Sequence, residues 1–211
     1  MKKLVKYGLR VLVSAILLVL MIWIGIWAYV HFNKPGLIRQ ISERITEKTN
    51  GESTIGDLSV NLLQTFPFIS IELADVVVKD SLWQVYNKTF FSAKRVYLRL
   101  SPFGLFNKNR GIGKVIITKG RLNLFTDSTN FNNQYILRSK KAVNKEISPL
   151  PDIHLVESEL IMENPSREKY HHFNLREFTV GTTEKGSLQV FDIDTDMFVT
   201  SLAFNTTKGS Y

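Results

Sequence analysis

The sequence predicts a mainly β protein that follows an N-terminal membrane helix. Residues 11–30 form a run of 20 residues without a charged side chain. From Gly51 onward, apolar and polar residues alternate with a period of two, which is typical of antiparallel strands with one apolar face. No catalytic motif accompanies these two patterns. We therefore expect a membrane-anchored domain built on a β-sheet, with helix only at its beginning.

The first expected element is a transmembrane anchor over residues 11–32. An α-helix rises about 1.5 Å per residue, so the uncharged run is about 30 Å long, the thickness of a bilayer's hydrocarbon core. The run is longer than the apolar part of a secretory signal and lacks an Ala-x-Ala cleavage pattern, which favours an uncleaved anchor over a cleaved signal. The tail 1–10 carries Lys2, Lys3, Lys6 and Arg10, which favour a cytoplasmic N-terminus and place the bulk of the chain across the membrane.

The basic charge of the chain belongs mostly to this membrane end. The formal net charge is +8, yet residues 1–42 carry six Lys or Arg and no acid, which leaves about +2 for the rest. Membrane topology and attraction to anionic headgroups explain such a distribution. The distal domain has no basic stripe interleaved with aromatic residues, so we expect no nucleic-acid partner. The absence of Cys excludes a disulfide framework, a thiol nucleophile and a Cys-based metal site.

A short amphipathic helix is expected over residues 33–51. Pro35 and its neighbours predict a break after the anchor helix, and Asn50-Gly51 predicts the helix end. The apolar residues between them recur at helical spacing, namely Leu37, Ile38, Ile41 and Ile45. Two interpretations stay open: the helix caps one end of a β core, or it lies flat on the bilayer.

Residues 52–211 are expected to form the β domain. The alternation is clearest around Ile71, Leu98 and Ile117, and Lys119-Gly120 predicts a tight turn between two strands. A polar, Lys- and Pro-containing loop is expected over residues 139–152. We expect roughly nine strands from the candidate ranges, which are 54–61, 69–78, 95–100, 114–118, 121–126, 153–156, 158–163, 173–180, 187–193 and 197–205.

Two β architectures fit this pattern. A sandwich buries its apolar face against a second sheet, whereas a curved open sheet keeps that face along a concave trough and fills it with something else. Periodicity alone does not separate them.

No enzyme motif is present. Gly111-Ile112-Gly113 lacks the third glycine of a dinucleotide loop. His154 lies in a strand pattern, and the adjacent His171 and His172 would point to opposite faces of a strand, a poor arrangement for chelating a metal. Alternating acids, Asp192, Asp194 and Asp196, favour a solvated strand face. We therefore expect no catalytic residue, no metal ligand and no cofactor.

Residues 55–78, in which Phe66-Pro67 leads into a strand, resemble the start of AsmA-like envelope proteins, particularly forms associated with Bacteroidetes. Similar pieces follow at residues 93–103, 112–127 and 133–137. This family is similar to the bridge-like lipid transfer proteins. The order of anchor, helix, Phe-Pro strand and later strands carries the resemblance over nearly the whole chain.

The resemblance implies a curved, mostly antiparallel open sheet, shaped like a taco, that binds phospholipid acyl chains. It implies an inner-membrane, single-pass protein with its bulk in the periplasm, contributing to phospholipid transport and outer-membrane biogenesis. Its partners would be membrane phospholipids and other envelope proteins. The candidate lipid-binding residues are Ile69, Ile71, Leu73, Val96, Leu98, Leu100, Val115, Ile117, Leu122 and Leu124.

Two further expectations complete the sequence analysis. Family members commonly run to several hundred residues, so we expect residues 52–211 to be the incomplete N-terminal segment of such a groove. The alternative function is a non-transport envelope scaffold, with a closed β-sandwich on a membrane stalk. A membrane-bound hydrolase is disfavoured because no nucleophile and base are arranged together.

Overall fold

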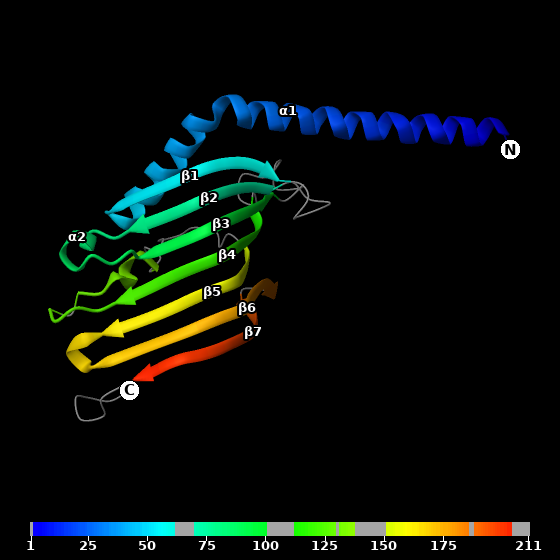
Figure 1. The fold of residues 1–211 in the computed structure, drawn as a ribbon. Coiled ribbons are helices and arrows are strands. Elements are labelled where there is room, and N and C mark those ends of the chain that lie inside the picture. Colours follow the sequence, from blue (N-terminus) through cyan, green and yellow to red (C-terminus); the bar gives the residue numbers. More distant parts are fainter. Residues whose placement is uncertain are drawn as a thin grey trace.

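In the computed structural model, one long helix leads into a single open sheet of seven strands, in the order β1-β2-β3-β4-β5-β6-β7 (Figure 1). The structure describes residues 2–61, 70–100, 112–129, 131–137, 151–185 and 188–203. The helices are α1 (Lys2–Thr49), α2 (Trp83–Tyr86), η1 (Asn133–Leu137) and η2 (Pro165–Arg167). The strands are β1 (Glu52–Asn61), β2 (Ser70–Lys79), β3 (Phe91–Leu100), β4 (Ile112–Phe125), β5 (Asp152–Asn164), β6 (Lys169–Lys185) and β7 (Leu188–Ala203).

The predicted open, mostly antiparallel sheet is confirmed. All neighbouring strands pair antiparallel except β4 and β5, which are parallel. Parallel neighbours need a crossover connection, and the segment from Thr126 to Pro151, which includes η1, supplies it. The alternative of a closed sandwich is wrong, because all seven described strands belong to one sheet.

The strand count is lower than predicted because three pairs of short candidate strands are single long strands. Lys119-Gly120 is not a turn, since β4 continues through it. Ranges 153–156 and 158–163 are joined in β5, and ranges 187–193 and 197–205 are joined in β7, which the structure describes as far as Ala203. At about 4.8 Å between strands, the described sheet is roughly 29 Å wide, whereas nine strands would give about 38 Å.

Helix α1 continues through Pro35, so the break predicted at Pro35 and its neighbours is wrong. Proline in a helix interior removes one hydrogen bond and clashes with the preceding turn, which kinks a helix without necessarily ending it. Figure 1 shows α1 bending once, between a projecting N-terminal arm and a stretch beside β1. By length and composition, α1 is suited to cross a membrane.

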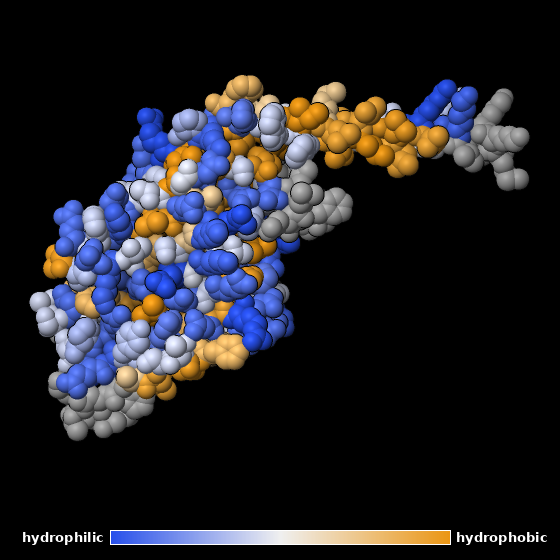
Figure 2. All heavy atoms as spheres, viewed as in Figure 1, coloured by the Kyte–Doolittle hydropathy of each residue, from blue (hydrophilic) through white to orange (hydrophobic). Residues whose placement is uncertain are grey.

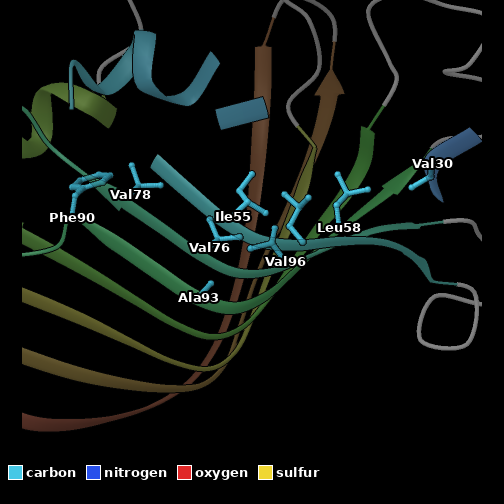
Figure 3. Packing of buried hydrophobic residues seen from close by; sticks show 9 residues of the cluster. Val30, Ile55, Leu58, Val76, Val78, Phe90, Ala93 and Val96 are labelled. Carbon is cyan, nitrogen blue, oxygen red and sulfur yellow. The ribbon is translucent and has the colours of Figure 1, made fainter. Parts of the chain in front are cut away.

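The C-terminal half of α1 caps the beginning of the sheet. Leu37, Ile38, Ile41 and Ile45 pack against a buried cluster whose members come from α1, the first three strands and Phe90 (Figure 3). This placement supports the capping interpretation over a helix lying flat on the bilayer. Val30 is only 7% exposed in the same cluster, so the last turns of the predicted anchor already contact the sheet.

Polar contacts hold the helix on the sheet as well. The Ser53 hydroxyl in β1 donates to the Ser42 carbonyl at 2.7 Å, and Lys34 forms an ion pair with Asp57. The Lys34 ammonium, which hydrogen-bonds the Asp57 carboxylate, lowers the pKa of that carboxyl. These contacts fix the direction in which α1 leaves the sheet.

A buried polar network around Asp80 fixes the C-terminal end of α1. Asp80 is fully buried, and one of its carboxylate oxygens accepts hydrogen bonds from the Leu82 amide at 2.8 Å and the Tyr86 hydroxyl at 2.7 Å. The other oxygen accepts from Asn133 at 3.3 Å. Burial, followed by the neighbouring Asp80 carboxylate, raises the pKa of Tyr86 well above its usual range, so its hydroxyl remains a donor.

Tyr135 completes this network. Its hydroxyl donates to the Thr49 carbonyl at the end of α1, at 2.5 Å, and accepts from the Ser81 amide at 3.2 Å. Gly51 is required beside it, because a Cβ there would lie 2.2 Å from the Lys79 carbonyl oxygen. We call Gly51, Asp80, Tyr86, Asn133 and Tyr135 the clamp. It joins the end of α1 to the β2–β3 connection and to the crossover after β4.

Candidate functional site

One face of the sheet is apolar from β1 to β7. Cross-strand pairs set its side chains next to one another: Ile117 pairs with Val96 on one side and Leu155 on the other, and Leu155 pairs with Phe178. Figure 3 shows the sheet curving around this face, with the labelled side chains of β1 to β3 pointing into the curve. We call it the concave face and the opposite one the convex face.

Every strand from β1 to β6 changes its alternation by one residue at the same level. In β4 both Ile117 and Gly120 face the concave side, and in β5 both Leu155 and Ser158 do, three positions apart instead of two. Regular cross-strand pairing is interrupted at this level, along a row made of Gly56, Asp75, Lys94, Lys119, Glu157 and Arg176.

Backbone conformation shows the same irregularity. Asp75, Lys119 and Glu157 have φ values of 49°, 51° and 49°, which non-glycine residues seldom adopt. An extra residue of this kind bends a strand and increases its twist. Because six successive strands bend at one level, the row folds the sheet along a line that crosses all of them. We call this line the crease, and it forms the floor of a trough with the two halves of each strand as walls.

The floor of the crease is lined by small residues. Ala93, Gly120 and Ser158 lie side by side there, in successive strands. The Ser158 hydroxyl accepts from the Gly120 amide and donates to the Val156 carbonyl, both at 3.1 Å, which satisfies backbone groups where regular pairing stops. A Cβ on Gly120 would lie 2.7 Å from Cγ2 of Ile117, so the bend leaves no room for a side chain.

Solvent access to the concave face rises across the sheet. Leu73 in β2 and Val96 in β3 are 4% and 7% exposed beneath α1, whereas Ile193 and Val199 in β7 are 59% and 53% exposed. The concave side chains of β4 and of most of β5 and β6 are half-buried. The trough is therefore filled by α1 at its beginning, and its apolar walls grow more exposed from β4 to β7 among the described residues.

The convex face is polar and carries paired charges. Figure 2 shows mostly hydrophilic side chains over the sheet, with hydrophobic ones along the projecting arm of α1 and near the lower edge, where β7 lies. A shallow depression of about 390 Å³ holds Lys119, Arg121, Glu157 and Glu159. Each base there already pairs with an acid, Arg121 with Glu159 at 2.9 Å and Lys119 with Glu157 at 3.8 Å.

Among the residues that the structure describes, no three or more His, Asp or Glu side chains come together in a group that could hold a metal ion. His154 pairs with Glu177 on the convex face at 2.9 Å. His171 and His172 point to opposite faces, as the sequence predicts, because His171 shares a row with Met162 and His172 contacts Glu159 at 3.3 Å. Asp192, Asp194 and Asp196 are exposed, also as predicted.

The predicted lipid-binding residues divide into two groups. Leu73 and Val96 are members of the buried core cluster beneath α1. The other described ones are half-buried on the same concave face and pack against that cluster: Ile71 in β2, Leu98 in β3, and Val115, Ile117, Leu122 and Leu124 in β4. Ile69 lies outside the described residues, and Leu100 is placed only by its backbone, at the end of β3.

Sequence reasoning missed the concave residues of the last three strands. The signal that could have found them is the same apolar alternation, which shifts by one position at the crease in β5 and β6 and continues without a shift through residues 193 to 199 of β7. The missed residues are Leu155, Leu160, Met162, Phe173, Phe178, Val180, Ile193, Met197 and Val199.

Comparison with known proteins gives one match. The model of the AsmA family matches residues 1–175, from the anchor through to the middle of β6. No curated protein and no solved structure matches the chain.

Proposed function

The chain belongs to the AsmA family, and on that basis we propose that its trough holds phospholipid acyl chains. The proposed role is non-enzymatic: a protein anchored in the inner membrane, with its sheet in the periplasm, that contributes to phospholipid transport and outer-membrane biogenesis. The observation that carries the proposal is the apolar concave face from β4 to β7, whose side chains go from half-buried in β4 to exposed in β7.

The size of this face fits an acyl chain. Three strand spacings of about 4.8 Å give roughly 14 Å of open trough along the crease. A bilayer's hydrocarbon core of about 30 Å contains two layers of chains, so one layer is roughly 15 Å deep. Burial of about 0.8 kcal/mol per CH₂ means that ten methylenes would contribute about 8 kcal/mol before the entropy of ordering the chain is subtracted.

Photocrosslinking in cells tests the proposal. A crosslinking amino acid at Ile193 faces the concave side, and the same amino acid at its neighbour Asp194 faces the convex side, while both positions are exposed. We expect phospholipid adducts at position 193 and none at position 194. Equal lipid labelling at both positions, or adducts at 193 that contain only protein, would contradict lipid binding in the trough.

The proposed location has its own test. Alkaline phosphatase fused after Asn50 should be active in a Gram-negative host, and the mature chain should keep Met1 or Lys2 at its N-terminus. An inactive fusion would place the sheet in the cytoplasm. A mature chain that begins near Asn33 would show that residues 11–30 are a cleaved signal.

A further inference from the structure

The two outer strands of the described sheet differ in what lies beside them. Helix α1 covers β1, where the Ser53 hydroxyl donates to the Ser42 carbonyl at 2.7 Å and Leu58 is buried beneath the helix. At the opposite edge of the sheet, β7 pairs only with β6 among the described strands (Figure 1). An edge strand directs the backbone N–H and C=O groups of alternate residues away from its neighbour. We call this row of outward groups and the side chains beside it the β7 edge.

The β7 edge lacks the features by which edge strands commonly avoid further pairing. Such strands are short, carry Lys or Pro, or contain a bulge that twists the edge away. Strand β7 has 16 residues and contains neither Lys nor Pro. Its pairing with β6 uses consecutive residues of β7 from Leu188 to Val199, so β7 has no extra residue in this stretch. Its backbone is therefore regular enough to accept another strand.

The concave side of the β7 edge offers apolar contacts. Four large apolar side chains on this side are between 47% and 59% exposed: Phe191, Ile193, Met197 and Val199. They occupy alternate positions, with Thr195 between Ile193 and Met197. A strand that paired with β7 would place every second side chain next to this row. The row therefore favours a partner with apolar residues at alternate positions.

The convex side of the β7 edge is acidic. Strand β7 contains no base, and its three acids on this side are exposed: Asp192, Asp194 and Asp196. Arg176 of β6 pairs with Asp196 at 3.1 Å. Gly181 and Thr179, which are uncharged, are the β6 residues opposite the other two acids. Charges that complement Asp192 and Asp194 would therefore have to come from the outer side of β7.

The same acids disfavour a second copy of this chain as the partner. Two β7 strands that pair antiparallel about a two-fold axis, with their concave faces on the same side, place residues opposite each other at equal distances from the axis. Every such register centred between residues 192 and 196 sets at least one of the three Asp side chains directly opposite another Asp. Like charges directly opposite each other destabilise a strand pair.

We infer that the β7 edge binds an extended segment of another polypeptide by strand addition. The segment has apolar residues at the positions that join the concave face and Lys or Arg at the positions that join the convex face. Backbone hydrogen bonds hold it, and its alternating side chains give specificity. The added strand would lengthen the concave face by about 4.8 Å. This inference does not depend on lipid binding in the trough.

Binding of fluorescent octapeptides to the full chain in non-ionic detergent tests the inference. The matching peptide alternates Lys and Val, the block control joins four Lys to four Val, and the acidic control alternates Glu and Val. Fluorescence anisotropy gives each dissociation constant. Because several favourable cross-strand pairs add together, we expect the matching peptide to bind at least about tenfold more tightly than either control. Non-specific attraction to a chain of net charge +8 would instead favour the acidic peptide.

Variants of the chain locate the binding surface. Asp192→Asn combined with Asp194→Asn should weaken binding of the matching peptide by about fivefold, because two cross-strand charge pairs are lost. Glu43→Gln combined with Asp75→Asn, which removes two exposed acids outside β7, should leave binding unchanged. Circular dichroism of each variant verifies that the sheet is intact.

Disulfide formation tests the orientation of the bound peptide, because the chain contains no cysteine of its own. A matching peptide with one central Lys replaced by Cys should link to the Asp194→Cys chain and not to the Thr195→Cys chain. A peptide with one central Val replaced by Cys should show the opposite preference. These results are expected because Asp194 and Thr195 face the convex and concave sides, respectively.

Several outcomes would overturn the inference. Equal binding of the matching peptide and the block control would show attraction by charge alone, without strand addition. Binding that is unaffected by loss of the two Asp carboxylates, or no binding of any peptide, would exclude the β7 edge as a site for a basic and apolar strand. If Asp194→Cys chains link to one another despite an excess of matching peptide, the partner is a second copy of this chain.

Discussion

Replacing Gly120 by alanine tests whether the crease is as tightly packed as its geometry indicates. The new Cβ would lie 2.7 Å from Cγ2 of Ile117 and 3.2 Å from the Ser158 hydroxyl. Contacts this short force neighbouring groups to move, and overpacking of this kind typically lowers stability by about 1–3 kcal/mol. Backbone conformation adds nothing to this penalty, because Gly120 does not have a positive φ.

A matched glycine provides the control. A Cβ on Gly181 in β6 would meet Asp192 only at 3.9 Å, an ordinary van der Waals distance, so Gly181→Ala should change stability by less than about 0.5 kcal/mol. Urea titrations of the full chain in detergent, followed by circular dichroism, give the free energy of unfolding for each variant.

A double-mutant cycle then identifies the cause of any loss. Ile117→Ala removes Cγ2. The loss of stability caused by Gly120→Ala should therefore be smaller in the Ile117→Ala background than in the wild type, by at least about 1 kcal/mol. The same loss in both backgrounds would show that Ile117 is not the obstacle. No loss in either background would refute the idea that the crease excludes a side chain.

Three further predictions concern the clamp, the crease and the helix contact. Gly51→Ala should lower stability by about 3 kcal/mol or more, because its Cβ would collide with backbone atoms of Lys79 and Asp80 that cannot rotate away; wild-type stability in urea would refute a tight clamp. Lys94→Cys and Arg95→Cys should react with a water-soluble maleimide at similar rates, since both neighbours face the convex side in a chain without other cysteines, whereas a regular strand would hide one of them. At pH values above the ordinary Asp pKa of 3.8, the Lys34–Asp57 pair should contribute at most about 1 kcal/mol to the free energy of unfolding. This contribution should disappear as the pH falls through the lowered pKa of Asp57. A difference in stability between wild type and Lys34→Ala that persists at lower pH would contradict this.

The sequence could predict the strands but not how many there are. A local pattern in which Ile117 and Gly120 stand three apart reads equally well as a turn or as an extra residue within one strand. The decision lies in the neighbouring strands: Lys94 and Glu157 are displaced at the same level, so pairing resumes on both sides and β4 continues. Register between strands is a non-local property, and the same reasoning explains why the parallel pairing of β4 and β5 was not predicted.

The sequence could predict that the candidate site is an apolar strand face, but not how much of that face is left exposed. Alternation showed which residues of β2 to β4 share a face, but it could not show that α1 covers Leu73 and Val96. Coverage depends on the path of α1 after Pro35, which follows from packing of Ile41 and Ile45 on the sheet and from the clamp at its end. A helix signal that would end at a proline in isolation continues here because the sheet stabilises the next turns.

The position of α1 also limits how lipid can enter the proposed trough. The helix is at once the membrane arm and the cover of the first strands, and the clamp ties its end to the sheet through Thr49 and Tyr135. Lipid arriving along α1 would have to displace a core that includes Leu58, which is 1% exposed. The walls at β5 to β7 offer less of an obstacle, because their apolar side chains are half-buried or exposed along the trough. Under the proposed function, we therefore propose that lipid exchanges over the side of the trough, at the walls formed by the later strands, rather than through the end that α1 covers.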